Sequence, residues 1–207
     1  MIKKCQKGFT LIEVVISMSI MGMVMMVIYS MFFTNYKTMN TVNTGVELQS
    51  QGESAMNYLV DAAISAKAIN SIKDKNGEVL QLNTSDNKEI TEISFTTVKF
   101  NKTDGTVDDD FINKMILQAN SNNAISLTEG LYKMYRVEEN PAGDKNIFIS
   151  SFISSIKVKP FGINLTGPVI LDDIKGIEFT ITLQKMNSGR VGDLMTKTIT
   201  NKVKFRN

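Results

Sequence analysis

The first third of the chain changes from uniformly apolar to apolar on one side only. Residues 8–33 read GFTLIEVVISMSIMGMVMMVIYSMFF, and no charged residue occurs from Val14 to Tyr36. At about 1.5 Å per residue, this uncharged run reaches roughly 34 Å as a helix, more than the bilayer core of about 30 Å. We therefore predict a membrane-spanning helix over residues 9–36.

The next segment, residues 37–72, has an amphipathic pattern. Apolar residues recur there at spacings of three and four, which predicts a helix with one apolar face that packs on a sheet. They are Met39, Val42, Val46, Met56, Leu59, Val60, Ala63, Ile64 and Ile69. No proline precedes Pro141, so the pattern predicts one long helix from Phe9 to Ile72, with Gly45 and Gly52 as candidate bends.

The remaining residues, 73–207, follow a two-residue period and predict a β-rich domain. A turn signal at residues 74–77 separates it from the helix. Strands are predicted at residues 79–82, 90–100, 131–138, 146–159, 176–186 and 196–205, with a turn at 101–105. The last two strands form a hairpin around a loop at 187–194. The predicted fold class is α+β: a long N-terminal helix, with a membrane half and an amphipathic half, packed on an antiparallel sheet.

Charge predicts the orientation of the membrane segment. Lys3, Lys4 and Lys7 precede it without any acid, which predicts a cytoplasmic N-terminus and an external remainder. The apolar run is too long for an ordinary secretory signal and lacks a small-x-small cleavage site after it. A cut at the polar–apolar border between Gly8 and Phe9 fits better, which makes residues 1–8 a leader. The alternative is an uncleaved signal-anchor.

Glu13 is the one acid in the apolar segment. The free energy of inserting a charged residue into a membrane helix is roughly 2.5–3.5 kcal/mol at the helix centre and smaller near an end. Charged residues within membrane helices usually serve a function. A cut after Gly8 would create an α-amino group at Phe9, about 6 Å from Glu13 along the axis. An amine from a staggered neighbouring chain could pair with Glu13, which predicts a filament. The apolar anchor around it comprises Leu11, Ile12, Val14, Val15, Ile16, Ile20, Met21, Val24, Val27, Ile28, Phe32 and Phe33.

The sequence KGFTLIEVVISMSIMG resembles the N-terminal signature of type IV prepilins and of the pseudopilins of type II secretion. The resemblance covers roughly residues 3–35. It implies that prepilin peptidase removes the leader after Gly8, that Phe9 is N-methylated, and that Glu13 acts in assembly. It also implies extraction from the membrane by an assembly ATPase and a polytopic platform protein.

Later residues resemble a subgroup of this family. Gly22 matches a helix-loosening glycine of many pilins, whereas Ser30 stands where major pilins often carry proline. Residues 47–66 (ELQSQGESAMNYLVDAAISA) are similar to the helix of PilW-type minor pilins and J-type minor pseudopilins. The ending KVKFRN, residues 202–207, is similar to closing strands of these minor subunits.

Composition makes an enzyme unlikely. The chain has no histidine, and its one cysteine, Cys5, lies in the leader, so histidine- and thiol-based catalysis and metal binding are excluded from the mature chain. We expect no cofactor and no metal. The acidic residues 104–110 lack the spacing of a calcium loop and are interpreted as a solvated turn, as are Asp172 and Asp173.

Basic residues do not indicate a nucleic-acid partner. Loss of the leader lysines lowers the formal net charge from +2 to −1, and therefore no nucleic-acid binding is expected. The alternating lysines at the predicted strand ends are expected on a solvent face or a subunit contact. They are Lys157, Lys159, Lys202 and Lys204.

These observations predict a structural subunit of a type IV pilus, either a minor pilin or a pseudopilin. Its partners would be prepilin peptidase, other pilin subunits and, indirectly, the platform protein and ATPase. It would lie in the cytoplasmic membrane before it reaches the cell surface in a filament. The alternatives are a pilus-tip binding module, a minor pseudopilin of a type II secretion system and a membrane-anchored enzyme.

Overall fold

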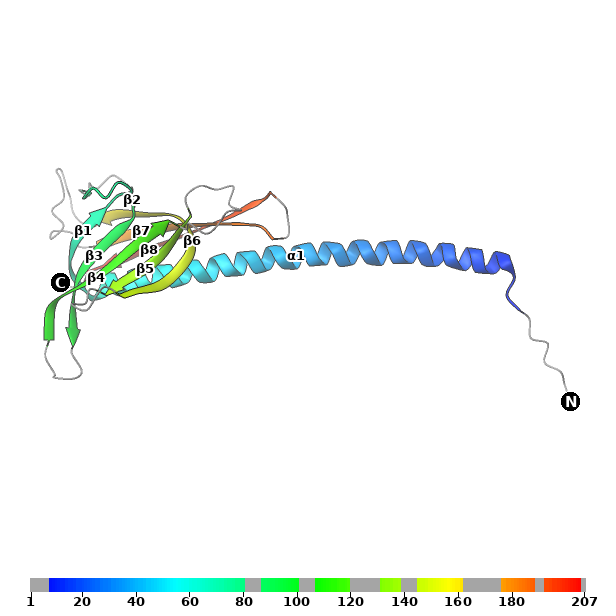
Figure 1. Cartoon of the computed structure of the whole chain (residues 1–207), viewed down its shortest axis with the longest axis horizontal. Helices are drawn as coiled ribbons and strands as arrows, with labels where there is room; N and C mark the ends of the chain where they lie inside the picture. Colours follow the sequence, from blue (N-terminus) through cyan, green and yellow to red (C-terminus); the bar gives the residue numbers. More distant parts are fainter. Residues whose placement is uncertain are drawn as a thin grey trace.

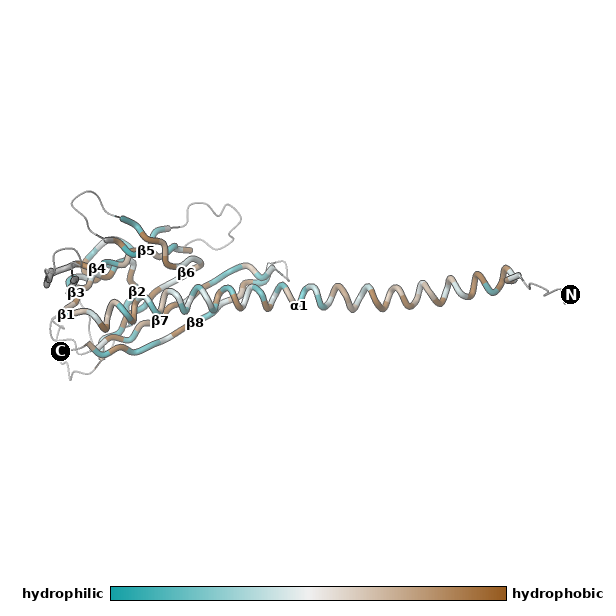
Figure 2. Tube along the Cα trace, turned by 90° about the horizontal axis from the view of Figure 1, so that it is seen from below, coloured by the Kyte–Doolittle hydropathy of each residue, from teal (hydrophilic) through white to brown (hydrophobic). Residues whose placement is uncertain are grey.

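A computed structural model describes residues 8–80, 87–100, 107–119, 131–138, 145–161, 176–188 and 192–205. One helix, α1 (Leu11–Ser65), runs the length of the molecule, and its C-terminal half packs on a curled antiparallel sheet (Figure 1). The predicted α+β class is confirmed, and the arrangement is like that of type IV pilins. The N-terminal half of α1 projects out of the domain and is mostly hydrophobic (Figure 2).

The strands of the sheet lie in the order β1-β3-β4-β5-β6-β7-β8, and every pairing is antiparallel. Strand β2 lies off this path and pairs with the second half of β6, beyond the part of β6 that pairs with β5. The strands are β1 (Ala66–Lys73), β2 (Lys88–Ile90), β3 (Glu92–Phe100), β4 (Val107–Ala119), β5 (Tyr132–Glu138), β6 (Lys145–Phe161), β7 (Gly176–Met186) and β8 (Leu194–Lys204).

The end of the helix differs from the prediction. Helix α1 ends at Ser65, and the segment expected to continue it to Ile72 is strand β1. Ala66, Ile69 and Ile72 are all buried, a spacing of three that resembles a helix. The register between β1 and β3 shifts twice, between Ala66 and Ala68 and between Ile69 and Ser71. These irregularities break the two-residue alternation of a regular strand, and the periodicity was therefore misleading.

The hairpin of β7 and β8 is confirmed, with residue-for-residue pairing from Gly176 opposite Lys204 to Met186 opposite Leu194. Strands β3 and β5 also lie where the alternation predicts them. The strand predicted at residues 146–159 is β6, which continues through Pro160 to Phe161, two residues beyond the predicted end. Of the predicted strand at 79–82, Val79 makes an isolated bridge to Lys73, and residues 81–82 lie outside the described residues.

Strand β4 was not predicted. Asp108–Asp110 belong to the first half of β4, so the prediction that they form part of a solvated turn is wrong. The rest of that predicted turn, residues 104–106, lies outside the described part of the chain. Three consecutive acids are unfavourable strand residues, and they conceal the following apolar alternation. Met115 and Leu117 of β4 are buried in the core.

The core lies between the second half of α1 and the inner face of the sheet. Leu48, Leu59, Phe95 and Phe179 are among its fully buried side chains. At Gly52, a Cβ atom would lie 2.5 Å from Ile199 Cδ1 and 2.8 Å from Leu183 Cδ1, so this glycine lets β7 and β8 approach the helix closely. Helix α1 is continuous through both Gly45 and Gly52.

Candidate functional site

The candidate assembly site lies at the exposed start of α1, far from the sheet (Figure 1). Gly8 and Phe9 precede the helix, and the Phe9 side chain is 87% exposed. Thr10 is the N-cap residue, with extended backbone angles, and Glu13 is the third helical residue. A peptidase that acts between Gly8 and Phe9 would therefore meet an extended segment directly before the first helical turn.

Thr10 and Glu13 form a reciprocal capping box. The backbone N–H and the hydroxyl of Thr10 donate to Glu13 Oε2 at 2.8 and 2.9 Å, and the Glu13 N–H reaches Thr10 Oγ1 at 3.4 Å. In the single chain, neutral donors therefore bind the Glu13 carboxylate at the N-terminal end of the helix dipole. No cation among the described residues pairs with this carboxylate.

The sequence prediction assigned a cationic partner to Glu13 and missed Thr10. The signal was present, because threonine followed three residues later by glutamate, before an apolar run, is the sequence pattern of a capping box. The leader lysines lie within residues 1–7, outside the described part of the chain. The intermolecular pairing of Glu13 with an amine at Phe9 stays a prediction.

The predicted anchor residues all lie on α1 outside the sheet domain, with side chains 43–84% exposed. This helix is long and apolar enough to cross a membrane. Hydroxyl groups within the apolar segment bond to the helix backbone: Ser17 to the Glu13 carbonyl at 2.6 Å, and Ser19 to the Val15 carbonyl at 2.9 Å. Bonding of this kind lets polar side chains lie in hydrocarbon, where no water is present.

Aromatic side chains lie at the C-terminal end of the apolar segment. The Tyr29 and Phe33 rings stack with centroids 6.2 Å apart, and Lys37 Nζ lies 4.5 Å from the Phe33 centroid. Amphipathic rings and lysine are typical of the membrane–water interface. This placement fits a segment that spans the bilayer and ends near Tyr36, as predicted.

Polar contacts join residues 41–51 of α1 to the sheet domain. Thr41 Oγ1 lies 3.1 Å from Asn187 Oδ1, and Lys185 Nζ lies 2.5 Å from Glu47 Oε2. One turn later, Gln51 Oε1 accepts from the Ser151 N–H at 2.9 Å. Ser151 precedes Phe152, which has a φ of 62° in the left-handed region, next to a register shift in β6. Gln51 therefore fixes the helix against an irregular point of this strand.

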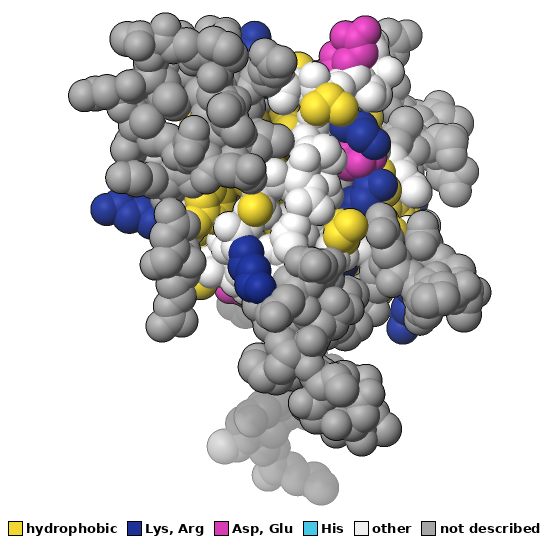
Figure 3. Space-filling model, turned by 90° about the vertical axis from the view of Figure 1, so that its left-hand side faces the viewer, with side chains coloured by type: hydrophobic (Ala, Val, Ile, Leu, Met, Phe, Trp, Pro, Cys, Tyr) yellow, Lys and Arg dark blue, Asp and Glu magenta, His cyan; other side chains and the backbone are white. Residues whose placement is uncertain are grey.

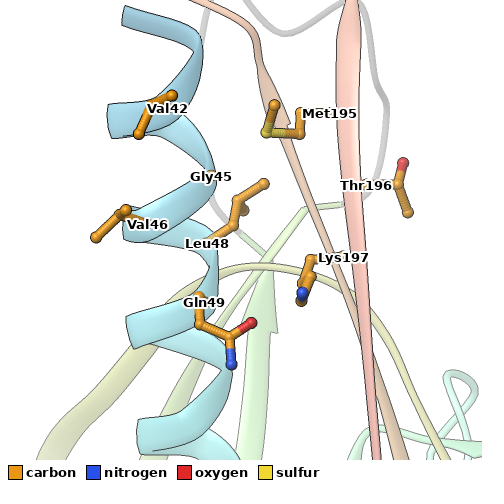
Figure 4. A pocket seen from close by; sticks show the side chains of 8 residues that line it. All are labelled: Val42, Gly45, Val46, Leu48, Gln49, Met195, Thr196 and Lys197. Carbon is orange, nitrogen blue, oxygen red and sulfur yellow. The ribbon is translucent and has the colours of Figure 1, made fainter. Parts of the chain in front are cut away.

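A groove of about 560 Å³ runs between α1 and the start of β8 (Figure 4). Val42, Val46 and Leu48 form its helix side, and Met195 and Lys197 belong to the strand side. The groove begins beyond the apolar membrane segment, and Val42 and Val46 are more than half exposed. Further along α1, the exposed positions up to residue 61 are polar, whereas Ile64 is about half exposed. The polar positions are Ser50, Glu53, Ser54, Asn57 and Asp61. Apolar contact with another helix is therefore favoured before Ser50.

The lysines singled out from the sequence share the outer face of β6, β7 and β8. Lys159 pairs in register with Glu178, which pairs in register with Lys202, and the Lys202–Glu178 ion pair measures 3.2 Å. Figure 3 shows lysine and arginine side chains scattered over the described part of the domain's far end.

The other acidic residues singled out from the sequence lie at positions 104–110 and 172–173. Within the described residues there is no group of three or more acidic, cysteine or histidine side chains that could hold a metal. The side chains of Asp108–Asp110 and all of Asp172 and Asp173 lie outside that part of the chain.

Residues 3–29 match the family model of the prokaryotic N-terminal methylation motif. This motif supports a type IV pilin or pseudopilin. It implies processing by prepilin peptidase and assembly with other pilin subunits, and together with the single apolar helix it fits membrane anchoring followed by entry into a pilus. No curated protein and no solved structure matches the chain.

Proposed function

We propose that this chain is a minor, non-enzymatic subunit of a type IV pilus. Prepilin peptidase cuts between Gly8 and Phe9, Phe9 is N-methylated, and α1 waits in the cytoplasmic membrane with its N-terminus inside. The assembly ATPase and platform protein then transfer the subunit into a helical filament. The observation that carries the proposal is the methylation motif at the start of α1, whose exposed apolar half contains one acid, Glu13, in the first turn.

Physical chemistry supports the transfer step. The apolar side chains of α1 are surrounded by lipid before assembly and by other helices afterwards, so the hydrophobic free energy changes little between the two states. The Glu13 charge differs, because it is stabilised when a cation from a neighbouring subunit approaches in a dry environment. Assembly therefore depends on Glu13 more than on any single apolar residue.

The minor role is supported by two features of the sequence. Ser30 stands where major pilins often carry proline, and residues 47–66 are similar to the helix of PilW-type minor pilins and of J-type minor pseudopilins. A pseudopilin of a type II secretion system shares the same first helix, and co-purification with sheared pili distinguishes the two.

The experiment replaces Glu13 by Gln in the native cells. Glutamine also fits the third position of a capping box, so E13Q removes the charge and keeps the helix start. We expect processing and membrane insertion to continue, and the amount of subunit in sheared filaments to fall at least about tenfold, which corresponds to about 1.4 kcal/mol of lost pairing.

The matched control is Glu53→Gln, which removes an exposed acid from the same helix and should leave the filament fraction unchanged. Normal incorporation of E13Q would refute the assembly role of the charge. Absence of even the wild-type chain from every filament fraction would refute the proposed function itself.

A further inference from the structure

A tight turn at residues 74–77 joins β1 to the segment that follows it. The Gly77 N–H donates to the Asp74 carbonyl at 3.1 Å, and Gly77 has a φ of 80° in the left-handed region. The Asp74 carboxylate accepts from the Asn76 N–H at 2.8 Å and from the Glu78 N–H at 3.0 Å. Asp74 therefore fixes the backbone of the turn, whereas Asn76 and Gly77 themselves are exposed.

The turn also holds the chain over one end of the sheet. Strand β1 comes first in the strand order, with β3 on one side of it. On its other side, Val79 bridges Lys73, and the Leu80 N–H donates to the Ile72 carbonyl at 2.8 Å. Leu80 also packs against the buried core. Residues 79–80 thus cover the C-terminal end of an edge strand and pair backbone groups that such an edge would otherwise present.

The dipeptide Asn76-Gly77 is the chemically labile point of this turn. It is the only Asn-Gly pair in the chain. Glycine has no Cβ to hinder approach to its amide nitrogen, and a Cβ built on Gly77 meets no atom within 4 Å beyond its chain neighbours. The side-chain amide of Asn76 is weakly bound, since its Nδ2 lies 3.4 Å from Asp74 Oδ2. The Asn76 side chain can therefore turn toward the Gly77 nitrogen, and water reaches both groups.

We propose that Asn76 is a site of spontaneous deamidation, and that its conversion releases residues 77–80 from the edge of β1. The Gly77 nitrogen loses its proton and bonds to Asn76 Cγ, and the side-chain nitrogen leaves with a proton as ammonia. Water then adds to one of the two carbonyl carbons of the resulting succinimide and opens the ring. Aspartate forms when the bond from Cγ to the Gly77 nitrogen breaks, and isoaspartate forms when the bond from the backbone carbonyl carbon breaks.

Both products oppose the hydrogen bonds of the turn. Each places a new carboxylate close in sequence to Asp74 and Glu78, and like charges repel. Isoaspartate also lengthens the main chain by one carbon before Gly77, so the N–H groups of Gly77 and Glu78 no longer meet Asp74 in their present positions. The contacts of residues 79–80 with β1 depend on this turn and open with it.

The test compares aged protein with fresh protein. Full-length wild type and N76Q are purified in detergent micelles and incubated in mildly alkaline buffer, and peptide mass spectrometry measures the conversion of each asparagine. Glutamine would have to close a larger and less favourable ring, so N76Q keeps the backbone of the turn without the reactive side chain. Asn70 is the internal control, because it also precedes a small residue, Ser71, but lies in β1 with its Oδ1 bonded to the Thr96 hydroxyl.

We expect Asn76 to convert at least about tenfold faster than Asn70 in the wild type, since glycine leaves its nitrogen open to attack. Amide hydrogen exchange at Leu80 should accelerate in aged wild type and stay unchanged in aged N76Q. Equal conversion at Asn76 and Asn70 would overturn the modification site. Conversion at Asn76 with unchanged exchange at Leu80 would overturn the release of residues 77–80.

Discussion

At the scale of single residues, Thr10 and Glu13 connect helix formation with assembly. Their capping box satisfies amide groups that would otherwise lack partners at the helix start, and it holds the carboxylate beside the residue that would carry the new amine. The residue types and spacing could be predicted from the sequence. The choice of Thr10 as the partner of Glu13 in the single chain depends on the extended backbone at the N-cap, which the structure shows.

A pair of substitutions at Thr10 tests its role in positioning Glu13. T10V removes the hydroxyl, and loss of an N-cap costs about 1 kcal/mol, so amide hydrogen exchange at Glu13 and Val14 should accelerate about fivefold in micelles. T10S keeps the hydroxyl and should exchange like the wild type. Equally fast exchange in T10S and T10V would contradict a role for the hydroxyl.

At the scale of elements, regular alternation could be predicted and interrupted alternation could not. Strand β7 keeps a two-residue period from Ile177 to Leu183, and β8 pairs with it without a register shift. Both strands were predicted from the sequence, as was the apolar half of α1. Strand β1 was mistaken for helix because its register shifts place buried residues three apart. The contact between Gln51 and β6 could not be predicted, since it joins segments 100 residues apart and depends on the irregularity at Phe152.

The two glycines of the domain half of α1 should respond differently to alanine. At Gly45, an added Cβ lies 3.6 Å from Met195 Sδ, an ordinary contact, so G45A should stabilise the chain by up to about 1 kcal/mol through helix propensity. At Gly52, the same methyl group meets Ile199 and Leu183 closer than 3 Å, so crowding should offset that gain. The larger G52V should destabilise by about 1–3 kcal/mol.

Urea unfolding of the full chain in detergent micelles measures these changes through the midpoint and slope of the transition. The order of stability should be G45A, wild type, G52V. A G52V variant as stable as G45A would contradict the close approach of β7 and β8 to the helix.

At the scale of the whole molecule, the chain combines a packed domain with a helix half that has no cover of its own. The anchor side chains are at least 43% exposed, whereas the second half of α1 contributes eight residues, from Thr44 to Ala63, to the buried interior. Such an exposed apolar length is unfavourable in water and must be covered by lipid or by other helices. The two environments correspond to the membrane-anchored and assembled states of the proposed function.

Assembly as proposed requires that removal of the leader creates a methylated amine at Phe9, next to Glu13. Mass spectrometry can identify the N-terminal peptide of the protein taken from its native cells. We expect a peptide that begins at Phe9 and carries one added methyl group. A peptide that retains Met1, Lys3, Lys4 and Lys7 would contradict it, because the new amine would not exist and the chain would be a plain membrane-anchored domain.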